Sequence, residues 1–235
     1  MLHSRTQRIC AICGYVCIVL FGLAFWPTSK FIPVPGPGLT ALQVASLYAN
    51  NANGIRFGML LMTIAGSLVA PFVAVISVQM KRIEGVSPIL TYTQLASGSV
   101  GALFFIIPAL VFGAAAYRPD RTPELTQALN DLAWFFMVMP VGPAIVQNVA
   151  IAFAILNDKR KNPVFPRWLG FFNIWVGLFI LPGGLMTFFK SGAFAWSGLL
   201  SFYVAGTVFG VWFQVMVFQL FKAIDRQAAE AADSA

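Results

Sequence analysis

Hydrophobic residues in this chain gather into six long runs, separated by short polar segments. Each run holds at least 18 residues without Asp, Glu, Lys or Arg. At a rise of about 1.5 Å per residue, such a run can cross a hydrocarbon core of about 30 Å. Backbone amides in lipid must be satisfied within the segment, so each run is predicted to be a helix. The expected transmembrane helices span approximately residues 9–26, 57–80, 95–117, 132–156, 168–189 and 194–221.

Composition agrees with this pattern and excludes a soluble globular domain. Hydrophobic residues make up 59% of the chain, charged residues 10%, and the mean hydropathy is +0.80. No segment outside the runs is long enough to form a core of its own. We therefore predict one transmembrane domain over residues 1–235, an all-α integral membrane protein with a six-helix transmembrane bundle.

Basic residues are unevenly divided between the two sets of connections. Ten fall on one side: Arg5, Arg8, Lys81, Arg82, Lys159, Arg160, Lys161, Arg167, Lys222 and Arg226. Five fall on the other: Lys30, Arg56, Arg118, Arg121 and Lys190. This positive-inside pattern predicts that both termini are cytoplasmic, and we expect a bacterial plasma-membrane protein. The net charge of +7 is explained by these loops and by anionic lipid, so no nucleic-acid partner is expected.

The outer connections are expected to carry short interfacial helices. Thr40 and Gln43 form a predicted capping box for a helix over residues 41–49. Thr122 is a candidate N-cap, with Pro123 in the first helical position. Such helices lie on the membrane surface or cover the bundle, and covering a ligand site and covering helix ends remain alternatives.

Prolines and glycines mark irregular or tightly packed positions inside the membrane. Prolines within the predicted helices are Pro71, Pro108, Pro140, Pro143 and Pro182. They predict either ordinary kinks or exposed backbone that binds a ligand. Gly206 and Gly210 form a GxxxG motif, which predicts close helix packing against this chain or another.

Polar side chains deep in the membrane provide the candidate ligand site. The deepest amides are Gln147, Asn148, Asn173 and Gln214, all in the half of the bundle expected to face the cytoplasm. Because unpaired amides are unfavourable in lipid, we expect these four to converge between the last three helices. They either join helices by hydrogen bonds or line a pocket for the polar group of an amphipathic molecule.

Groups for metal, cofactor or acid–base chemistry are scarce. The single histidine is His3, and the three cysteines, Cys10, Cys13 and Cys17, share one face of the first helix. Small packing residues have this spacing, and a metal site would need ligands from elsewhere. No nucleophile–base pair has a useful spacing, so we assign no catalytic, cofactor or metal residues.

Three functional classes remain open. The first is a non-enzymatic protein that binds or passes a neutral, lipid-like or apolar small molecule. The second is a structural or accessory subunit of a homo-oligomer or a larger membrane complex. The third is a membrane-embedded enzyme acting on a hydrophobic substrate. Membrane lipids are the expected surroundings in every case.

Overall fold

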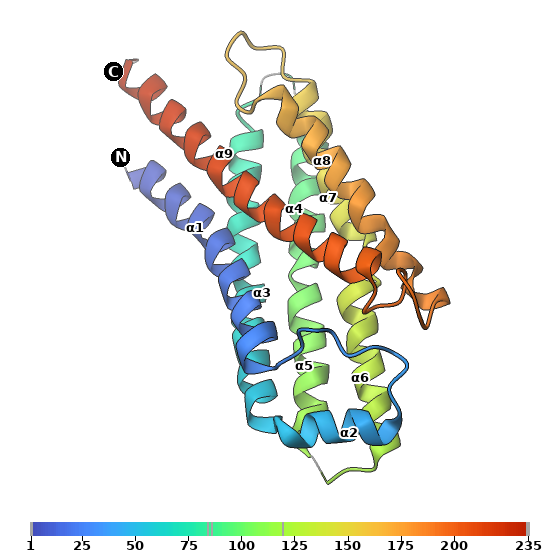
Figure 1. Cartoon of the computed structure of the whole chain (residues 1–235). Coiled ribbons are helices and arrows are strands. Elements are labelled where there is room, and N and C mark those ends of the chain that lie inside the picture. Colours follow the sequence, from blue (N-terminus) through green and yellow to red (C-terminus); the bar gives the residue numbers. More distant parts are fainter. Residues whose placement is uncertain (1, 84, 86, 119, 234–235) are drawn as a thin grey trace.

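A computed structural model describes residues 2–83, 85, 87–118 and 120–233. These residues form helices and connecting turns, with no strand among them. Six of the helices are long and apolar enough, by length and composition, to cross a membrane, which confirms the predicted six-helix bundle. Figure 1 shows an elongated bundle with both chain ends together at one end and a short crosswise helix at the other. We call these the terminal end and the α2 end.

Each spanning unit consists of one helix or of two successive helical segments. In chain order the elements are α1 (Leu2–Leu23), η1 (Ala24–Thr28), α2 (Ala41–Asn50), α3 (Ala52–Met80), α4 (Pro88–Gly101), α5 (Leu103–Tyr117), α6 (Pro123–Val138), α7 (Gly142–Leu156), α8 (Arg167–Ile180), η2 (Leu181–Phe188), η3 (Leu199–Val204) and α9 (Ala205–Asp233). Of these, η1 and η3 are π-helical turns and η2 is a 3₁₀ helix. Several helices extend past the apolar runs, because their polar end turns continue the same backbone hydrogen bonding.

The prolines differ in their effect on the helices. Pro71 and Pro108 lie inside α3 and α5, which continue through them. The helix does break between Val138 and Gly142, around Pro140, where the missing proline N–H removes a helical hydrogen bond. The division between α4 and α5 falls at Ala102, without a proline, so this irregularity was not predicted.

Short α2 covers one end of the bundle. The predicted capping box is present, since the Thr40 N–H donates to Gln43 Oε1 at 2.8 Å and the Gln43 N–H donates to Thr40 Oγ1 at 3.3 Å. Tyr48 of α2 is fully buried and donates to Asn130 Oδ1 of α6 at 3.1 Å. The sequence allowed this helix either to lie on the membrane surface or to cover the bundle, and in the structure it covers the bundle (Figure 1). The second outer connection leads directly into α6.

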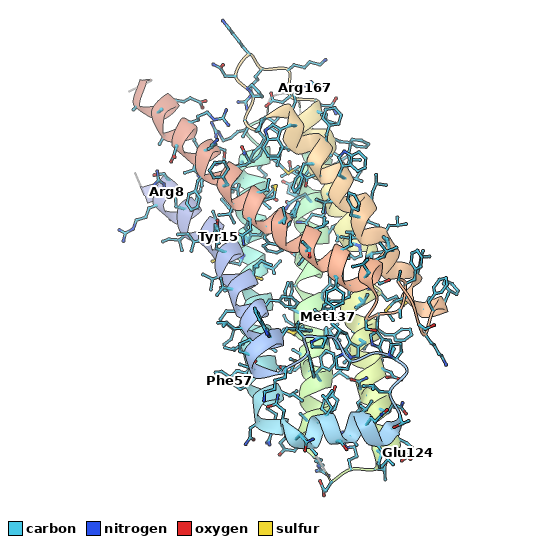
Figure 2. All side chains as sticks on the ribbon, viewed as in Figure 1. Arg8, Tyr15, Phe57, Glu124, Met137 and Arg167 are labelled. Carbon is cyan, nitrogen blue, oxygen red and sulfur yellow. The ribbon has the colours of Figure 1, made fainter. Side chains whose placement is uncertain are left out.

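Side chains are sorted as a membrane requires. Figure 2 shows Tyr15 and Phe57 on the flank of the bundle, with Arg167 near one end and Glu124 near the other. Tyr15 is 42% exposed and Phe57 54% exposed, so apolar surface faces outward where lipid would lie. Six spanning helices with this sorting indicate an integral membrane protein.

First and last helices meet only at the terminal end. Figure 1 shows α1 and α9 side by side near the chain ends, after which α9 crosses obliquely toward α8 and the two diverge. Near the meeting point a Cβ on Gly14 would lie 2.7 Å from the Phe72 ring and 3.0 Å from Val217, so glycine allows α1, α3 and α9 to pack closely there.

Candidate ligand cavity

The four predicted amides occupy different environments. Asn173 is fully buried and accepts a hydrogen bond from Trp212 Nε1 at 2.9 Å, which joins α8 to α9. Asn148 donates to the Ala144 carbonyl oxygen of its own helix at 2.8 Å, and Gln214 is half-buried. Gln147 is 7% exposed, and its Nε2 has no hydrogen-bond partner. No hydrogen bond is found between any two of these four side chains, each of which lies within the described part of the chain.

Instead, the bundle contains an apolar cavity of about 420 Å³, which we call the main cavity. It lies in the half of the molecule nearer α2, in the space where α1 and α9 diverge. Its walls come from α1, η1, α5, α6, α7, α8, η2, η3 and α9. Met137, labelled in Figure 2, contributes to the wall from α6. The volume falls within the range of about 300–1,000 Å³ that is usual for ligand pockets.

Irregular backbone surrounds the main cavity. Both π-helical turns contribute to its wall, η1 through Phe25 and Trp26 and η3 through Phe202 and Tyr203. The break between α6 and α7 contributes Pro140. Turns of the π type are often found at functional sites, and breaks are tolerated in a membrane where they line a cavity.

The GxxxG motif of α9 also belongs to this cavity. A Cβ added to Gly206 or Gly210 would meet no atom within 4 Å, and the same holds for Gly22 on α1. All three glycines line the main cavity. By contrast, a Cβ on Gly98 of α4 would lie 2.5 Å from Gln147 Nε2, so that glycine permits a close contact between helices. The motif on α9 therefore borders open space and does not pack against another helix of this chain.

Aromatic rings form much of the inner wall. Phe21 and Phe105 meet edge to face with ring centroids 5.5 Å apart, and Phe25 stacks on Phe202 at 6.3 Å. Edge-to-face and offset ring pairs are favourable and hold the rings in fixed positions. The polar side chains of the wall are the hydroxyls of Ser201, Tyr203 and Thr207 and the indole of Trp26. No charged side chain lines the main cavity within the described residues.

Residues 31–39, which we call the strap, close the cavity toward the α2 end. The Val34 N–H donates to the Tyr203 hydroxyl at 3.2 Å, and Trp196 Nε1 donates to the Pro35 carbonyl oxygen at 2.9 Å. These contacts join the segment after α1 to the segment before α9. Figure 1 shows the strap running across the bundle between them. Ile32 of the strap also lines the cavity.

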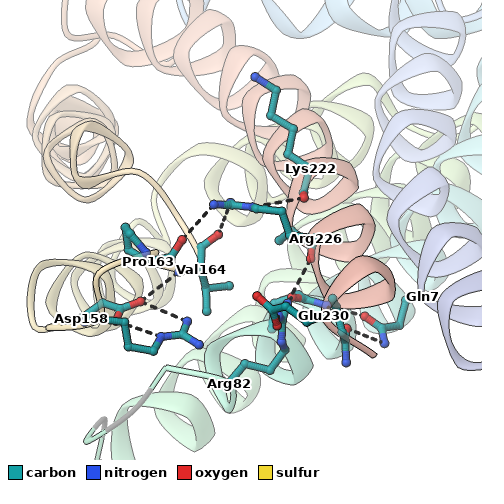
Figure 3. A network of polar contacts seen from close by, with 12 residues as sticks. Gln7, Arg82, Asp158, Pro163, Val164, Lys222, Arg226 and Glu230 are labelled. Atoms are coloured by element: carbon teal, nitrogen blue, oxygen red, sulfur yellow. Dashed lines mark hydrogen bonds and ion pairs between the residues drawn. The ribbon is translucent and has the colours of Figure 1, made fainter. Parts of the chain in front are cut away.

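A polar network joins α1 and α9 at the terminal end, beyond the cavity. Its members, Gln7, Gln79, Arg82, Gln227 and Glu230, come from α1, α3, the turn after α3 and α9, and we call them the terminal network (Figure 3). Gln79 Nε2 donates to Gln227 Oε1 at 2.9 Å and also to Gln7. Arg82 donates to Gln79 Oε1 at 2.7 Å and pairs with Glu230 at 2.7 Å. The network keeps α1 and α9 together at the terminal end, whereas the cavity extends only to Ile18 of α1 and Gly210 of α9.

The open side of the cavity therefore faces sideways, between α1 and α9. Gly22 on α1 and Gly206 and Thr207 on α9 are exposed and form its rim. Trp26, at the end nearer α2, is 71% exposed. In a membrane this opening faces the acyl chains of lipid.

A second, smaller cavity of about 20 Å³ lies beside the main one, and we call it the side cavity. Phe104, Phe105, Ala144 and Phe209 line both spaces. Gln147 lines the side cavity, whereas Asn148, Asn173 and Gln214 line neither cavity. Of the four predicted residues, only Gln147 thus lines one of these two cavities.

Two ionisable groups outside the spanning helices are shifted by their surroundings. Burial raises the pKa of the Tyr48 phenol, and the Asp131 charge raises it further, so Tyr48 remains a neutral donor to Asn130. Burial by itself raises the pKa of Asp158, but hydrogen bonds from Arg160 and Val164 outweigh it and the pKa lies below its ordinary value. Both groups hold segments outside the membrane in place.

Sequence reasoning did not find the main cavity. Its lining is apolar, so no residue in it stands out from ordinary core or lipid-facing positions. Two signals were present: Pro140, which predicted either a kink or ligand-binding backbone, and the GxxxG motif, which predicted close packing. A cavity depends on how helices diverge, and hydropathy along one chain does not record this.

Comparisons with protein-family models, curated proteins and solved structures find no match to this chain. Within the described residues, no group of three or more His, Cys, Asp or Glu residues is placed to hold a metal ion. Cys17 is buried and Cys10 and Cys13 are half-buried in α1, whereas the side chain of His3 lies outside the described part. The cavity itself is thus the main evidence about function.

Proposed function

We propose that this protein binds or passes a neutral, lipid-like or apolar small molecule, and that the main cavity holds it. The observation that carries the proposal is a hollow of about 420 Å³ with an apolar wall and a side opening between α1 and α9. Burial of apolar ligand surface contributes roughly 25 cal/mol per Å², so hydrocarbon gains most from such a site. We propose no catalytic residue.

Absence of charge supports a neutral ligand. No Lys or Arg of the described residues lines the main cavity, so the charge of a fatty acid or phosphate group would be buried without a partner. Burying an unpaired charge is strongly unfavourable. The hydroxyls of Tyr203 and Thr207 can orient a weakly polar group near the rim.

The position of the opening supports entry from the bilayer. The strap closes the cavity toward the α2 end, and the terminal network holds α1 and α9 together at the other end. A molecule dissolved in lipid reaches the rim sideways without crossing either barrier. With the orientation predicted from the positive-inside pattern, we propose that the cavity lies in the outer half of a bacterial plasma membrane.

Filling the cavity tests the proposal. Gly206→Leu and Gly210→Leu place side chains in the empty space, where an added Cβ meets no atom within 4 Å. The full chain is purified in lipid nanodiscs, and bound small molecules are identified by native mass spectrometry. We expect a stoichiometric neutral molecule on the unsubstituted protein and a large loss of it on both variants.

Gly177→Leu is the matched control. Gly177 lies in α8, its Cβ direction is also free of atoms within 4 Å, and it does not line the main cavity. This variant should keep the bound molecule. Retention of the molecule by both filled variants would contradict the proposal. A stable assembly of several chains without any small molecule would favour the accessory-subunit alternative.

A further inference from the structure

We infer that the bound molecule carries a neutral carbonyl oxygen at its deep end and that Gln147 Nε2 donates a hydrogen bond to it. The inference rests on the proposed function, since it names the chemistry of the molecule in the main cavity. Gln147 is then the residue that makes this molecule bind more tightly than a hydrocarbon without the oxygen.

The amide of Gln147 is buried without a partner. The residue is 7% exposed, and Nε2 makes no hydrogen bond. Such a group normally finds a partner, because a buried donor that has lost water and gained nothing is unfavourable. Asn173 follows this rule through Trp212 and Gln94 through Ser77, whereas Asn148 Oδ1 is also unpaired but Asn148 lines neither cavity. An unpaired donor therefore indicates a missing acceptor.

Space for that acceptor exists beside the amide. The side cavity has a volume of about 20 Å³, enough for one water-sized group. Gly98 makes room for the amide itself, since a Cβ there would lie 2.5 Å from Nε2. The other side chains around this space are Val, Phe, Ala and Trp, and the Trp212 N–H is already bonded to Asn173. A water molecule would find few of the two to four partners that buried waters have.

The side cavity adjoins the inner wall of the main cavity. Phe105 and Phe209 line both spaces, with ring centroids 6.2 Å apart. Phe209 is half-buried and packs against Phe105 and Phe213, so these rings form the boundary that a bound molecule has to displace to join the two spaces. A chain or ring system in the main cavity can then extend a single oxygen to Gln147.

The chemistry of this oxygen is restricted by the surroundings. No charged side chain of the described residues lines the side cavity, which disfavours a carboxylate or phosphate. A carbonyl oxygen accepts from Nε2 and brings no donor that needs a further partner. A long-chain or cyclic ketone thus fits better than an acid or an unsubstituted alkane.

Paired probes test the inference. The full chain in nanodiscs is titrated with a long-chain methyl ketone and with the alkane of equal length, each bearing a mid-chain diazirine. Photolabelling is quantified, and labelled peptides are identified by mass spectrometry. One neutral hydrogen bond should make the ketone bind roughly 2- to 12-fold more tightly than the alkane. Labels should fall on peptides of α1, α5 and α9.

Variants assign the difference to Gln147. Gln147→Leu should bring the ketone-to-alkane affinity ratio close to one, because it removes the donor that only the ketone uses. Gly98→Ala should also lower the ratio, because its Cβ displaces the amide. Asn148→Leu is the control, since Asn148 is the buried neighbour of Gln147 but lines neither cavity. It should leave the ratio unaltered.

Failure of the inference and failure of the proposed function give different results. Equal affinity for ketone and alkane in the unsubstituted protein would overturn the role of Gln147 while leaving an apolar binding site. Equal affinity for the ketone and for the ionised fatty acid of the same length would also overturn it. Absence of saturable labelling by either probe would overturn both.

Discussion

Gln147 and Asn173 are both buried amides on membrane helices, yet their hydrogen bonding differs. Asn173 holds Trp212, which ties α8 to α9. The Nε2 of Gln147 has no partner and faces a small hollow. At the residue scale, the first amide stabilises the bundle, whereas the second is available to a ligand.

Replacement of these two amides should have opposite effects on stability. Gln147→Leu removes an unpaired buried amide and should raise the free energy of unfolding of the ligand-free protein by about 1 kcal/mol. Asn173→Leu leaves Trp212 Nε1 without a partner and should lower it by about 1–3 kcal/mol. Both are measured by denaturant titration in mixed micelles, with tryptophan fluorescence as the signal. Loss of stability in Gln147→Leu comparable to that in Asn173→Leu would show that Gln147 joins helices.

At the scale of elements, side-chain hydrogen bonds and an ion pair fix the last turns of α9 to its neighbours. Arg82, in the turn after α3, donates to the Ala223 carbonyl oxygen at 3.0 Å and to buried Gln79, in addition to its pair with Glu230. Arg226 of α9 donates to the Pro163 carbonyl oxygen at 2.9 Å, in the connection between α7 and α8 (Figure 3). The helix is thus fixed at the terminal end, while its first turns border the cavity.

Truncation within the terminal network should distinguish buried from exposed contacts. The Glu230 side chain is 61% exposed, so Glu230→Gln should lower stability by less than about 1 kcal/mol. Arg82→Ala should cost more, about 1–3 kcal/mol, because Gln79 and a helix carbonyl lose their donor. Hydrogen exchange at the end of α9 should speed up clearly only in Arg82→Ala. Equal effects of the two substitutions would contradict this ranking.

The connection between α7 and α8 should respond to acid. Its Asp158 accepts from the Val164 N–H at 2.9 Å, and its pKa is lowered in the folded protein by this bond and by Arg160. A folded pKa below the unfolded one stabilises the loop above the ordinary carboxyl pKa of about 4, and this stabilisation is lost as pH falls through the folded value.

We therefore expect the Val164 amide to lose protection below about pH 4, as measured by hydrogen exchange corrected for intrinsic rates. Asp158→Asn should remove the pH dependence at this amide. Amides in the middle of α3, far from the loop, provide the internal reference. Unchanged protection of Val164 through this range would argue against the lowered pKa.

For the whole molecule, orientation in the membrane is a prediction from the ten-to-five division of basic residues. In a chain whose three native cysteines are replaced by alanine, single cysteines at Lys30, Arg121 and Lys190 should react in intact cells with a membrane-impermeant thiol reagent. A cysteine at Lys161 should react only after permeabilisation. Lys161 is exposed, so burial would not explain its protection. The reverse labelling pattern would show that the orientation in the membrane is the opposite of the predicted one.

Sequence by itself determined the six spanning helices and the short helix capped by Thr40, because both depend on local rules. An apolar run in lipid must satisfy its own backbone, and a capping box joins residues three apart. It also located the deep amides, since polarity can be read residue by residue. It did not determine which of them is paired, because Asn173 meets Trp212 only through the crossing of α8 and α9.

Only the tertiary structure decided that α1 and α9 diverge and leave a cavity. Their meeting point depends on contacts between residues far apart in the chain, such as Gln7 with Gln227, 220 positions away. Helix periodicity gives the face of α9 that carries Gly206 and Gly210, but the presence of a neighbour on that face depends on the crossing of whole helices. Here the face is empty, so a motif typical of close packing became part of a cavity wall.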